Sequence, residues 1–383
     1  MPHRLAILAS HPVQYNSPVF RLLAKHKDIE LRVFYGWEGA TSSSQADAGF
    51  GQKFQWDIPL LDGYDHEVLT NDGPTDVSHF KGLSSPDAIE RITKWQPDAL
   101  LVYGWSYRTH LNCLRHFSGR LKIFFRGDST LLDERPGWRK LARRIYLRRI
   151  YRHVDYALCV GSHNRDYFLT HGLTESQLLD APHSIENERF ADPDGIHEAA
   201  AREWLDKLGI SNGERTFLFA GKFEPKKAPL DLLNAFSKLE SGHLLLAGSG
   251  ELEEAMRAVS SERVHYLGFQ NQSQMPVVYR LGDVVILPSQ GPGETWGLAL
   301  NEAMACSRAV IGSDRCGGAA DLIAPGENGE IFEAGNVGRL SSAMNRFVRG
   351  ESDPARMGCR SRDRIEGWSN QRQVEAVIEG LAR

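Results

Sequence analysis

The chain has 383 residues, which at about 150 residues per domain predicts two or three domains. Its 45 lysines and arginines against 49 aspartates and glutamates give a net charge of −4, and such a balance is not that of a dedicated nucleic-acid binder. The 41% hydrophobic and 25% charged residues are typical of globular domains and exclude wholesale disorder.

Short apolar runs alternate with amphipathic stretches in the first half of the chain. Runs of about five residues that are apolar on both faces are typical of buried strands in a parallel sheet. Helical patterns at 19–24 and 86–95 lie between them, so we expect a doubly wound α/β domain. The predicted strands are 5–9, 31–35, 99–103, 121–125 and 156–160.

A charged linker follows at about 183–214, and the same alternation then starts again. This predicts a second doubly wound domain. Ligands bind beyond the carboxyl ends of such strands, so two facing domains would form a cleft for a nucleotide and a second substrate. The predicted strands are 216–220, 244–247, 264–266, 284–287 and 309–312, and the predicted helices are 198–208, 229–239, 251–259, 275–280 and 298–306.

The densest motif runs from Gly291 to Ala305, directly after the predicted strand 284–287. Glycines let the backbone approach a ligand, and a helix that starts near Trp296 would direct free N–H groups at a diphosphate. Glu294 before the helix and Glu302 inside it could accept hydrogen bonds from a sugar and a ribose. The alternative is a glycine-rich turn before an ordinary amphipathic helix.

Two further turns follow strands of this second domain. Lys222 and Lys227 flank a turn around Pro225, where two ammonium groups could neutralise a diphosphate leaving group, although a solvated basic turn is the commoner case for a single Lys pair. The Gly248-Ser-Gly250 segment is half of a dinucleotide fingerprint, and a tight strand–helix turn explains it better.

Polar side chains also follow strands of the first domain, where an acceptor substrate could lie. Alternative interpretations are a Pro-bounded turn after the first strand, and a helix N-cap with a satisfied ion pair after the fourth. The candidates are His11, Gln14, Tyr15 and Asn16 after the first strand, and Arg126 and Asp128 after the fourth.

The segment from Trp138 to His153 predicts a helix with seven Lys or Arg. It could lie on anionic lipid or hold a phosphorylated acceptor, or it could be a solvated helix face. Five scattered cysteines without a Cys-x-x-Cys pair argue against disulfides and a zinc site. The apolar run Leu5–Ala9 is too short for the hydrophobic region of a signal peptide. We therefore expect a cytoplasmic protein, with peripheral contact to the inner membrane face as an option.

Taken together, these motifs resemble the second half of family-4 retaining glycosyltransferases, which have the GT-B fold. The resemblance runs in order over about 216–333, through Gly221, Lys222 and Lys227, then Gly248, Gly268 and the Glu294-x7-Glu302 pair, and ends at Gly317-Gly318. It implies an acceptor domain over 1–190, a nucleotide-sugar donor domain over 191–366 and, at 367–383, a final helix that returns to the first domain.

The resemblance also implies roles for residues. A UDP-, GDP- or ADP-linked sugar would be bound without a metal or other cofactor, with Lys222 and Lys227 at the diphosphate. Glu294 would contact the donor sugar and Glu302 the ribose. The base would lie near Gly268 and Phe269, and backbone N–H groups near Thr295, Trp296, Gly297 and Leu298 would face the phosphates.

The N-terminal half departs from the family. The first loop has His11 to Tyr15 where many relatives have a Gly-Gly pair, and Arg126-Gly-Asp128 replaces a His near the reacting carbon. Asp128 or His11 could take that role, and the acceptor is left open. A nucleotide-sugar epimerase or hydrolase, and a non-catalytic nucleotide-sugar-binding scaffold, are the alternative functions.

Overall fold

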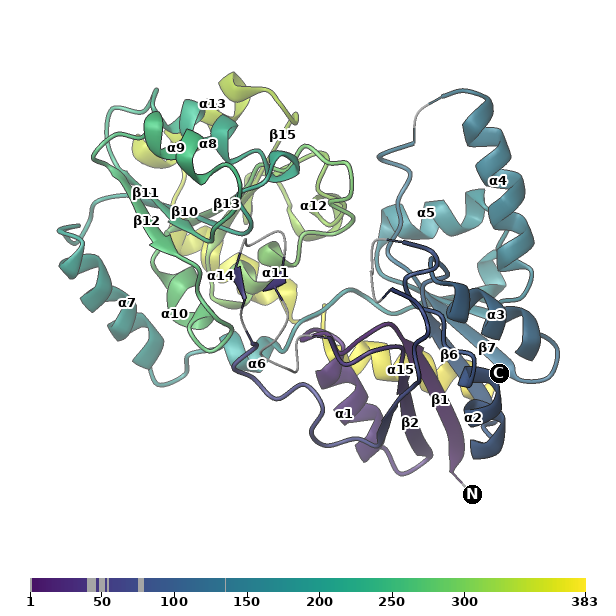
Figure 1. The fold of residues 1–383 in the computed structure, drawn as a ribbon. Helices are drawn as coiled ribbons and strands as arrows, with labels where there is room; N and C mark the ends of the chain where they lie inside the picture. The colour runs from purple at the N-terminus through teal and green to yellow at the C-terminus, as the bar shows by residue number, and fades with distance from the viewer. Residues whose placement is uncertain (1, 40–45, 48–51, 54, 75–78, 135) are drawn as a thin grey trace. The chain divides into compact units, whose positions relative to one another are not determined.

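The computed structural model describes residues 2–39, 46–47, 52–53, 55–74, 79–134 and 136–383 (Figure 1). The chain forms two compact units. Unit 1 comprises Met1–Gln45, Ile58–His183 and Asn370–Arg383, and unit 2 comprises Ala46–Asp57 and Ser184–Ser369. None of the helices in the described residues is long and apolar enough to cross a membrane.

Unit 1 is built on a seven-stranded parallel sheet with the order β5-β2-β1-β6-β7-β8-β9. Residues alternate between its faces with period two: Leu5 and Ile7 of β1 contact α1 and α15, while Ala6 and Leu8 lie in the core with α2 to α5. The strands are β1 (His3–Ala9), β2 (Ile29–Tyr35), β5 (His66–Val68), β6 (Ala99–Tyr103), β7 (Lys122–Arg126), β8 (Tyr156–Cys159) and β9 (Leu178–Asp180).

Six α-helices cover the two faces of this sheet. The last one, α15, lies against the sheet of unit 1, where Lys122 Nζ donates to its final carbonyls at Gly380 and Leu381 (3.0 Å each) (Figure 1). A cation there complements the negative end of the helix dipole. The helices are α1 (Ser17–Lys25), α2 (Ala88–Trp95), α3 (Arg108–Phe117), α4 (Trp138–Tyr151), α5 (Ser162–Thr170) and α15 (Asn370–Ala382).

Unit 2 has a six-stranded parallel sheet with the order β12-β11-β10-β13-β14-β15. A short antiparallel pair, β3 (Ala46–Asp47) and β4 (Gln52–Lys53), also belongs to it. Its strands are β10 (Thr216–Ala220), β11 (His243–Ala247), β12 (Val264–Gly268), β13 (Val284–Leu287), β14 (Ala309–Ser313) and β15 (Gly329–Phe332). Its helices are α6 (Asn187–Phe190), α7 (Ile196–Lys207), α8 (Pro229–Phe236), α9 (Glu253–Ala258), α10 (Met275–Arg280), α11 (Leu298–Ala305), α12 (Ala319–Leu322), α13 (Val337–Val348) and α14 (Pro354–Ile365).

The ten strands predicted from apolar runs are confirmed to within two residues at either end. The two-residue strands β3 and β4 were not predicted. Three strands of the two large sheets were not predicted either: β5, β9 and β15. Each lies at an edge of its sheet and has only three or four residues. An edge strand is covered less than a central one, so it does not need the two-sided apolar run that marks the others.

Candidate functional site

In unit 2 the strand order reverses between β10 and β13, the neighbours at the centre of the sheet. Open α/β sheets bind ligands just beyond the carboxyl ends of their strands at such a reversal. The turn after β10 contains the 3₁₀ helix Pro225–Lys227, and the loop after β13 contains Ser289 and Glu294. These two connections meet, because the N–H of Gln290 donates to the Lys226 carbonyl (2.9 Å).

A charged pair occupies this reversal point. Lys227 Nζ forms an ion pair with Glu294 Oε2, and Ser289 Oγ donates to the same oxygen (2.8 Å). Only 19% of the Lys227 side chain and 8% of the Glu294 side chain are exposed. Removing one partner from such a pair leaves a poorly solvated charge. A diphosphate at this edge would compete with Glu294 for the ammonium and free the carboxylate to accept hydrogen bonds from hydroxyls.

Helix α11 starts next to this pair. Gly297 is its N-cap and adopts φ +93, a conformation that favours glycine, and an added Cβ would lie 2.5 Å from Cys316 Sγ. The first turn contains no acidic residue, so the positive end of the helix dipole is not offset by its own side chains. An anion at the carboxyl edge of β13 would therefore find both an ammonium and a helix N-terminus.

Trp296 contributes its backbone rather than its ring to this edge. The side chain is 3% exposed, its indole N–H donates to Asn301 Oδ1 (2.8 Å), and its ring lies 5.2 Å from that of Trp368. Its carbonyl accepts from the Gly318 N–H (2.8 Å). Gly317 is required here too, since an added Cβ would lie 1.8 Å from the Thr295 carbonyl oxygen. The Gly317-Gly318 pair thus lets a second loop lie against 295–296.

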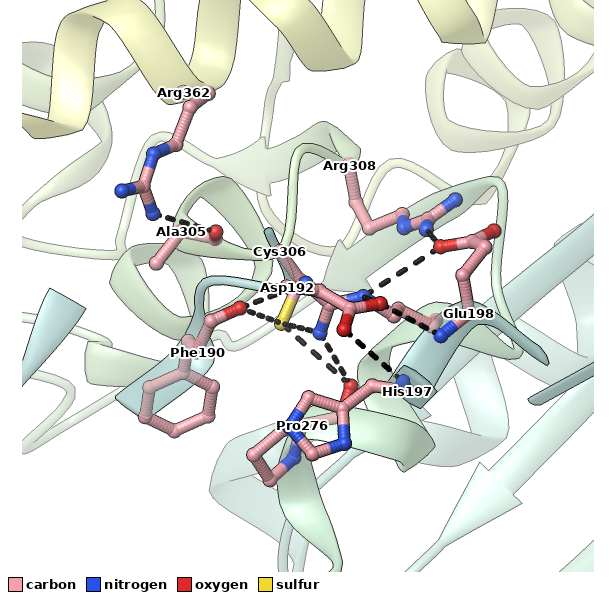
Figure 2. Close-up of polar contacts among 10 residues, drawn as sticks. Phe190, Asp192, His197, Glu198, Pro276, Ala305, Cys306, Arg308 and Arg362 are labelled. Atoms are coloured by element: carbon pink, nitrogen blue, oxygen red, sulfur yellow. Dashed lines mark hydrogen bonds and ion pairs between the residues drawn. The ribbon is translucent and has the colours of Figure 1, made fainter. Parts of the chain in front are cut away.

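The other end of α11 is fixed by arginines from neighbouring elements, as Figure 2 shows for the contacts around Cys306. Arg362 of α14 donates to the Ala305 carbonyl (2.9 Å), the last residue of the helix. The buried Arg280 of α10 donates to the Phe190 carbonyl (2.8 Å) and to Cys306 Sγ (3.3 Å), and its Nε lies 3.5 Å from Asp192 Oδ2. These contacts fix the C-terminal end of α11, the helix that directly follows the loop containing Glu294.

Glu302 lies in the second turn of α11, as predicted, but its side chain is buried. It is 3% exposed, and its Oε2 accepts a hydrogen bond from the Tyr279 hydroxyl (2.6 Å). Tyr279 comes from α10 and is itself buried. The ribose contact of Glu302 stays a prediction, and Tyr279 is the residue that orients this carboxylate.

Glycines at or directly after the ends of β10, β11 and β12 line the same edge. The Gly221 N–H donates to the Ala247 carbonyl (2.9 Å), and the Gly248 N–H donates to the Gly268 carbonyl (2.8 Å). An added Cβ at Gly248 would lie 1.9 Å from the Gly221 carbonyl oxygen, so only glycine fits. Lys222 and Phe269 are half-buried in these connections. All donor-side candidates therefore belong to unit 2.

The acceptor-side candidates all belong to unit 1, whose strand order reverses between β1 and β6. His11 follows β1; its Nδ1 lies 3.0 Å from Ser10 Oγ, and its ring lies 5.5 Å from that of Trp37. Burial lowers the pKa of His11, which favours the neutral imidazole. Gln14, Tyr15 and Asn16 are half-buried in the connection to α1, where Asn16 is the N-cap residue.

Arg126 ends β7 and is 5% exposed, with Nη1 donating to the Ala181 carbonyl (2.9 Å). Its guanidinium thus supports the connection after β9, and an acceptor contact stays a prediction. Asp128 and Arg126 both act electrostatically on His183, whose pKa is lowered to about 4, first by burial and then by Arg126, against the opposing effect of Asp128. The sequence assigned His183 to the linker, because β9, the edge strand that ends three residues before it, was not predicted.

One comparison with known proteins concerns a part of the chain that lies within unit 2. Residues 201–364 match the family model of the glycosyl transferases group 1. The D-inositol 3-phosphate glycosyltransferases of Mycolicibacterium smegmatis and Mycolicibacterium gilvum are 27% and 29% identical over 186 and 195 residues, which are 46% and 48% of this chain. The chain spans 42% of the length of these curated relatives.

Solved structures match over the whole chain and show its fold. Sucrose-phosphate synthase from Thermosynechococcus elongatus is 18% identical with a TM-score of 0.77, covering 100% of this chain and 98% of its own. HepE from Anabaena, solved in complex with UDP, is 16% identical with a TM-score of 0.74, covering 99% of each chain. With two doubly wound parallel sheets, the chain has the GT-B architecture that the sequence predicted.

Proposed function

We propose that the protein is a glycosyltransferase that moves a sugar from a nucleoside diphosphate sugar to an acceptor, with retention of configuration and without a metal. The observation that carries the proposal is the Lys227–Glu294–Ser289 cluster at the strand reversal of unit 2, next to the N-terminus of α11. The region around this cluster matches the glycosyl transferases group 1, and a neighbour of the same fold was solved with UDP-glucose.

In the proposed reaction the bond between the sugar C1 and the diphosphate oxygen breaks, and a bond forms between C1 and the acceptor oxygen. The acceptor proton passes to the departing diphosphate on the same face of the sugar. Lys227, Lys222 and the N–H groups of Gly297 and Leu298 would stabilise the negative charge that develops on the leaving group. These positive groups are why we expect no metal requirement.

The remaining candidates orient the substrates in this proposal. Glu294 would accept hydrogen bonds from donor sugar hydroxyls, and Glu302, held by Tyr279, would accept them from the ribose. His11 and Asp128 of unit 1 are the candidates for contacts to the acceptor near C1, with Gln14, Tyr15, Asn16 and Arg126 around them. The acceptor itself is not assigned.

A thermal-shift screen with UDP, GDP, ADP and their sugars in EDTA tests the donor site, because a ligand of the folded state raises its melting temperature. We expect one base class to stabilise the protein, and Glu302→Ala to abolish the effect of the sugar nucleotide. Glu327→Ala, on the surface of unit 2, is the matched control. Absence of any shift in a folded sample would overturn the donor site, and nucleoside diphosphate release without an acceptor would favour a hydrolase.

A further inference from the structure

Helix α4 carries a concentration of exposed apolar side chains. Trp138 is 77% exposed, Leu141 62%, Ile145 46% and Tyr146 40%, all within the 14 residues of this one helix. Elsewhere in the described chain, large exposed apolar residues occur singly, at Val68, Phe80, Ile196 and Val259. Scattered residues need no explanation, whereas a group of this kind marks an interaction surface.

These side chains do not face the core of unit 1. The buried residues of α4 are Leu147, Ile150 and Tyr151, all in its C-terminal half. At about 100° per residue, Trp138, Leu141 and Ile145 project from the opposite side of the helix. Figure 1 shows α4 at the outside of unit 1, and its buried residues, all in the C-terminal half, pack against α5 and the sheet. The N-terminal half therefore presents a free apolar stripe.

The same side of the helix is strongly basic. Arg148, Arg149 and Arg152 continue the stripe towards the C-terminus, and 138–153 contains seven Lys or Arg and no Asp or Glu. Lys140 pairs with Glu134 (3.1 Å), but within the described residues Arg148 and Arg149 form no ion pair. We call Trp138, Leu141, Ile145, Arg148, Arg149 and Arg152 the α4 face.

We propose that the α4 face docks on an anionic lipid bilayer, with the helix lying in the plane of the interface. An apolar stripe that enters the headgroup region, next to arginines that pair with lipid phosphates, is the combination that such a surface binds. A nucleic acid would leave Trp138, Leu141 and Ile145 without an apolar partner, and a purely apolar protein groove would leave the arginines unpaired.

Tyr146, which follows Ile145 but lies outside the α4 face, connects α4 with the carboxyl edge of the sheet in unit 1. The ring of Tyr146 lies 5.6 Å from that of Trp105, which is in the connection after β6. That connection borders the strand reversal between β6 and β1. Docking through α4 would thus place this edge of unit 1 close to the bilayer. The docking itself does not rest on the proposed function, because binding is measured without substrates.

Flotation of the full chain with vesicles of phosphatidylcholine, with and without about 30% phosphatidylglycerol, tests the proposal. We expect binding to the anionic vesicles only, and weaker binding when NaCl is raised from about 50 to about 500 mM. Arg148→Gln/Arg149→Gln should weaken binding about 25-fold, at about fivefold per charge. Arg356→Gln/Arg360→Gln, on an exposed face of α14, is the matched control and should leave binding unchanged.

The apolar half of the face has its own test. Trp138→Ala/Leu141→Ala should weaken binding about tenfold or more, while Ile196→Ala/Val259→Ala removes equally exposed side chains of unit 2 without effect. Brominated lipid should quench tryptophan fluorescence in the wild type, and Trp138→Phe should remove that quenching. Melting temperatures of the variants check that each is folded.

The proposal fails if the protein does not float with anionic vesicles at low salt. It also fails if the α4 variants bind as well as their controls, or if quenching persists in Trp138→Phe. Binding that is equal on neutral vesicles would refute the role of the arginines. Each of these results leaves the nucleotide-sugar site of unit 2 untouched, so failure here is distinguishable from failure of the proposed function.

Discussion

The ion pair of Lys227 and Glu294 makes a quantitative prediction about stability. Lys227→Met keeps most of the side-chain volume but leaves the Glu294 carboxylate, 8% exposed, with the hydrogen bond from the Ser289 hydroxyl. Loss of one partner from a buried pair costs about 3 to 5 kcal/mol. Because 19% of the Lys227 side chain reaches solvent, we expect the lower end, about 3 kcal/mol.

A double-mutant cycle separates the pair from its surroundings. Two unit charges about 3 Å apart interact by about 5 kcal/mol at an effective dielectric constant of 20. Partial desolvation of both groups offsets part of this, which leaves a coupling of about 2 to 3 kcal/mol. Glu294→Gln is isosteric and leaves an ammonium that can reach water, so it should cost less than Lys227→Met. The double variant should therefore be more stable than the sum of the single variants predicts.

Scanning calorimetry is the assay, because the two units can unfold separately and a single two-state midpoint is then not defined. Only the transition of unit 2 should move, by about 2 to 4 °C for each kcal/mol. Lys226→Met, at a neighbouring side chain of the same turn whose partner is Glu224, is the matched control. If the effects of the two single substitutions add strictly in the double variant, the interaction between Lys227 and Glu294 is refuted. An equal shift in the transition of unit 1 would refute the location of the ion pair in unit 2.

Three further predictions concern the framework around the two strand reversals. Gly248→Ala places a Cβ 1.9 Å from the Gly221 carbonyl and should lower the melting temperature and abolish nucleotide stabilisation, whereas Gly338→Ala, with no contact closer than 3.5 Å, should be nearly neutral. Arg280→Met should lower the free energy of unfolding, measured by urea denaturation, by about 3 to 5 kcal/mol, because Asp192 loses its buried guanidinium partner. The control Arg360→Met, where the arginine side chain is 67% exposed, should change it by less than about 0.5 kcal/mol. Burial lowers the pKa of His110 from 6.5 to about 4, so the unfolded chain binds the proton more readily than the folded one. This contribution to stability, up to about 3 kcal/mol, is fully present above pH 6.5 and should be lost as the pH falls towards 4. His110→Gln should flatten this dependence in denaturation curves measured at several pH values, and His3→Gln should not.

The sequence predicted the central strands well because these strands are buried on both faces. A run such as Phe217-Leu218-Phe219 leaves few alternatives, since each of these residues is fully buried. The edge strand β5 has half-buried and exposed residues and carried no comparable signal. Apolar periodicity reports burial, so it finds strands in proportion to how deeply they are covered.

Lys227 and Glu294 in the charged cluster of unit 2 were both candidates from the sequence, but their pairing was not predicted. Lys227 and Glu294 are 67 positions apart, and their contact depends on β10 and β13 being neighbours, which the strand order determines and the residue types do not. Tyr279 and Ser289 were missed for the same reason. Each becomes significant only because a fold contact brings its hydroxyl to a glutamate.

The residues at the two strand reversals differ in how specifically they indicate a ligand. Under the proposed function, the residues at the reversal of unit 2 are charged and glycine-rich because a diphosphate, wherever it occurs, calls for cations, helix N-terminal N–H groups and close backbone approach. An acceptor imposes no such shared chemistry, so the loops after β1 and β7 contain polar residues of ordinary kinds, such as Gln14 and Asn16. We therefore infer that the acceptor must be sought from the surroundings of unit 1. The exposed apolar and basic face of α4 is the part of those surroundings with a definite chemical preference, and it favours a membrane.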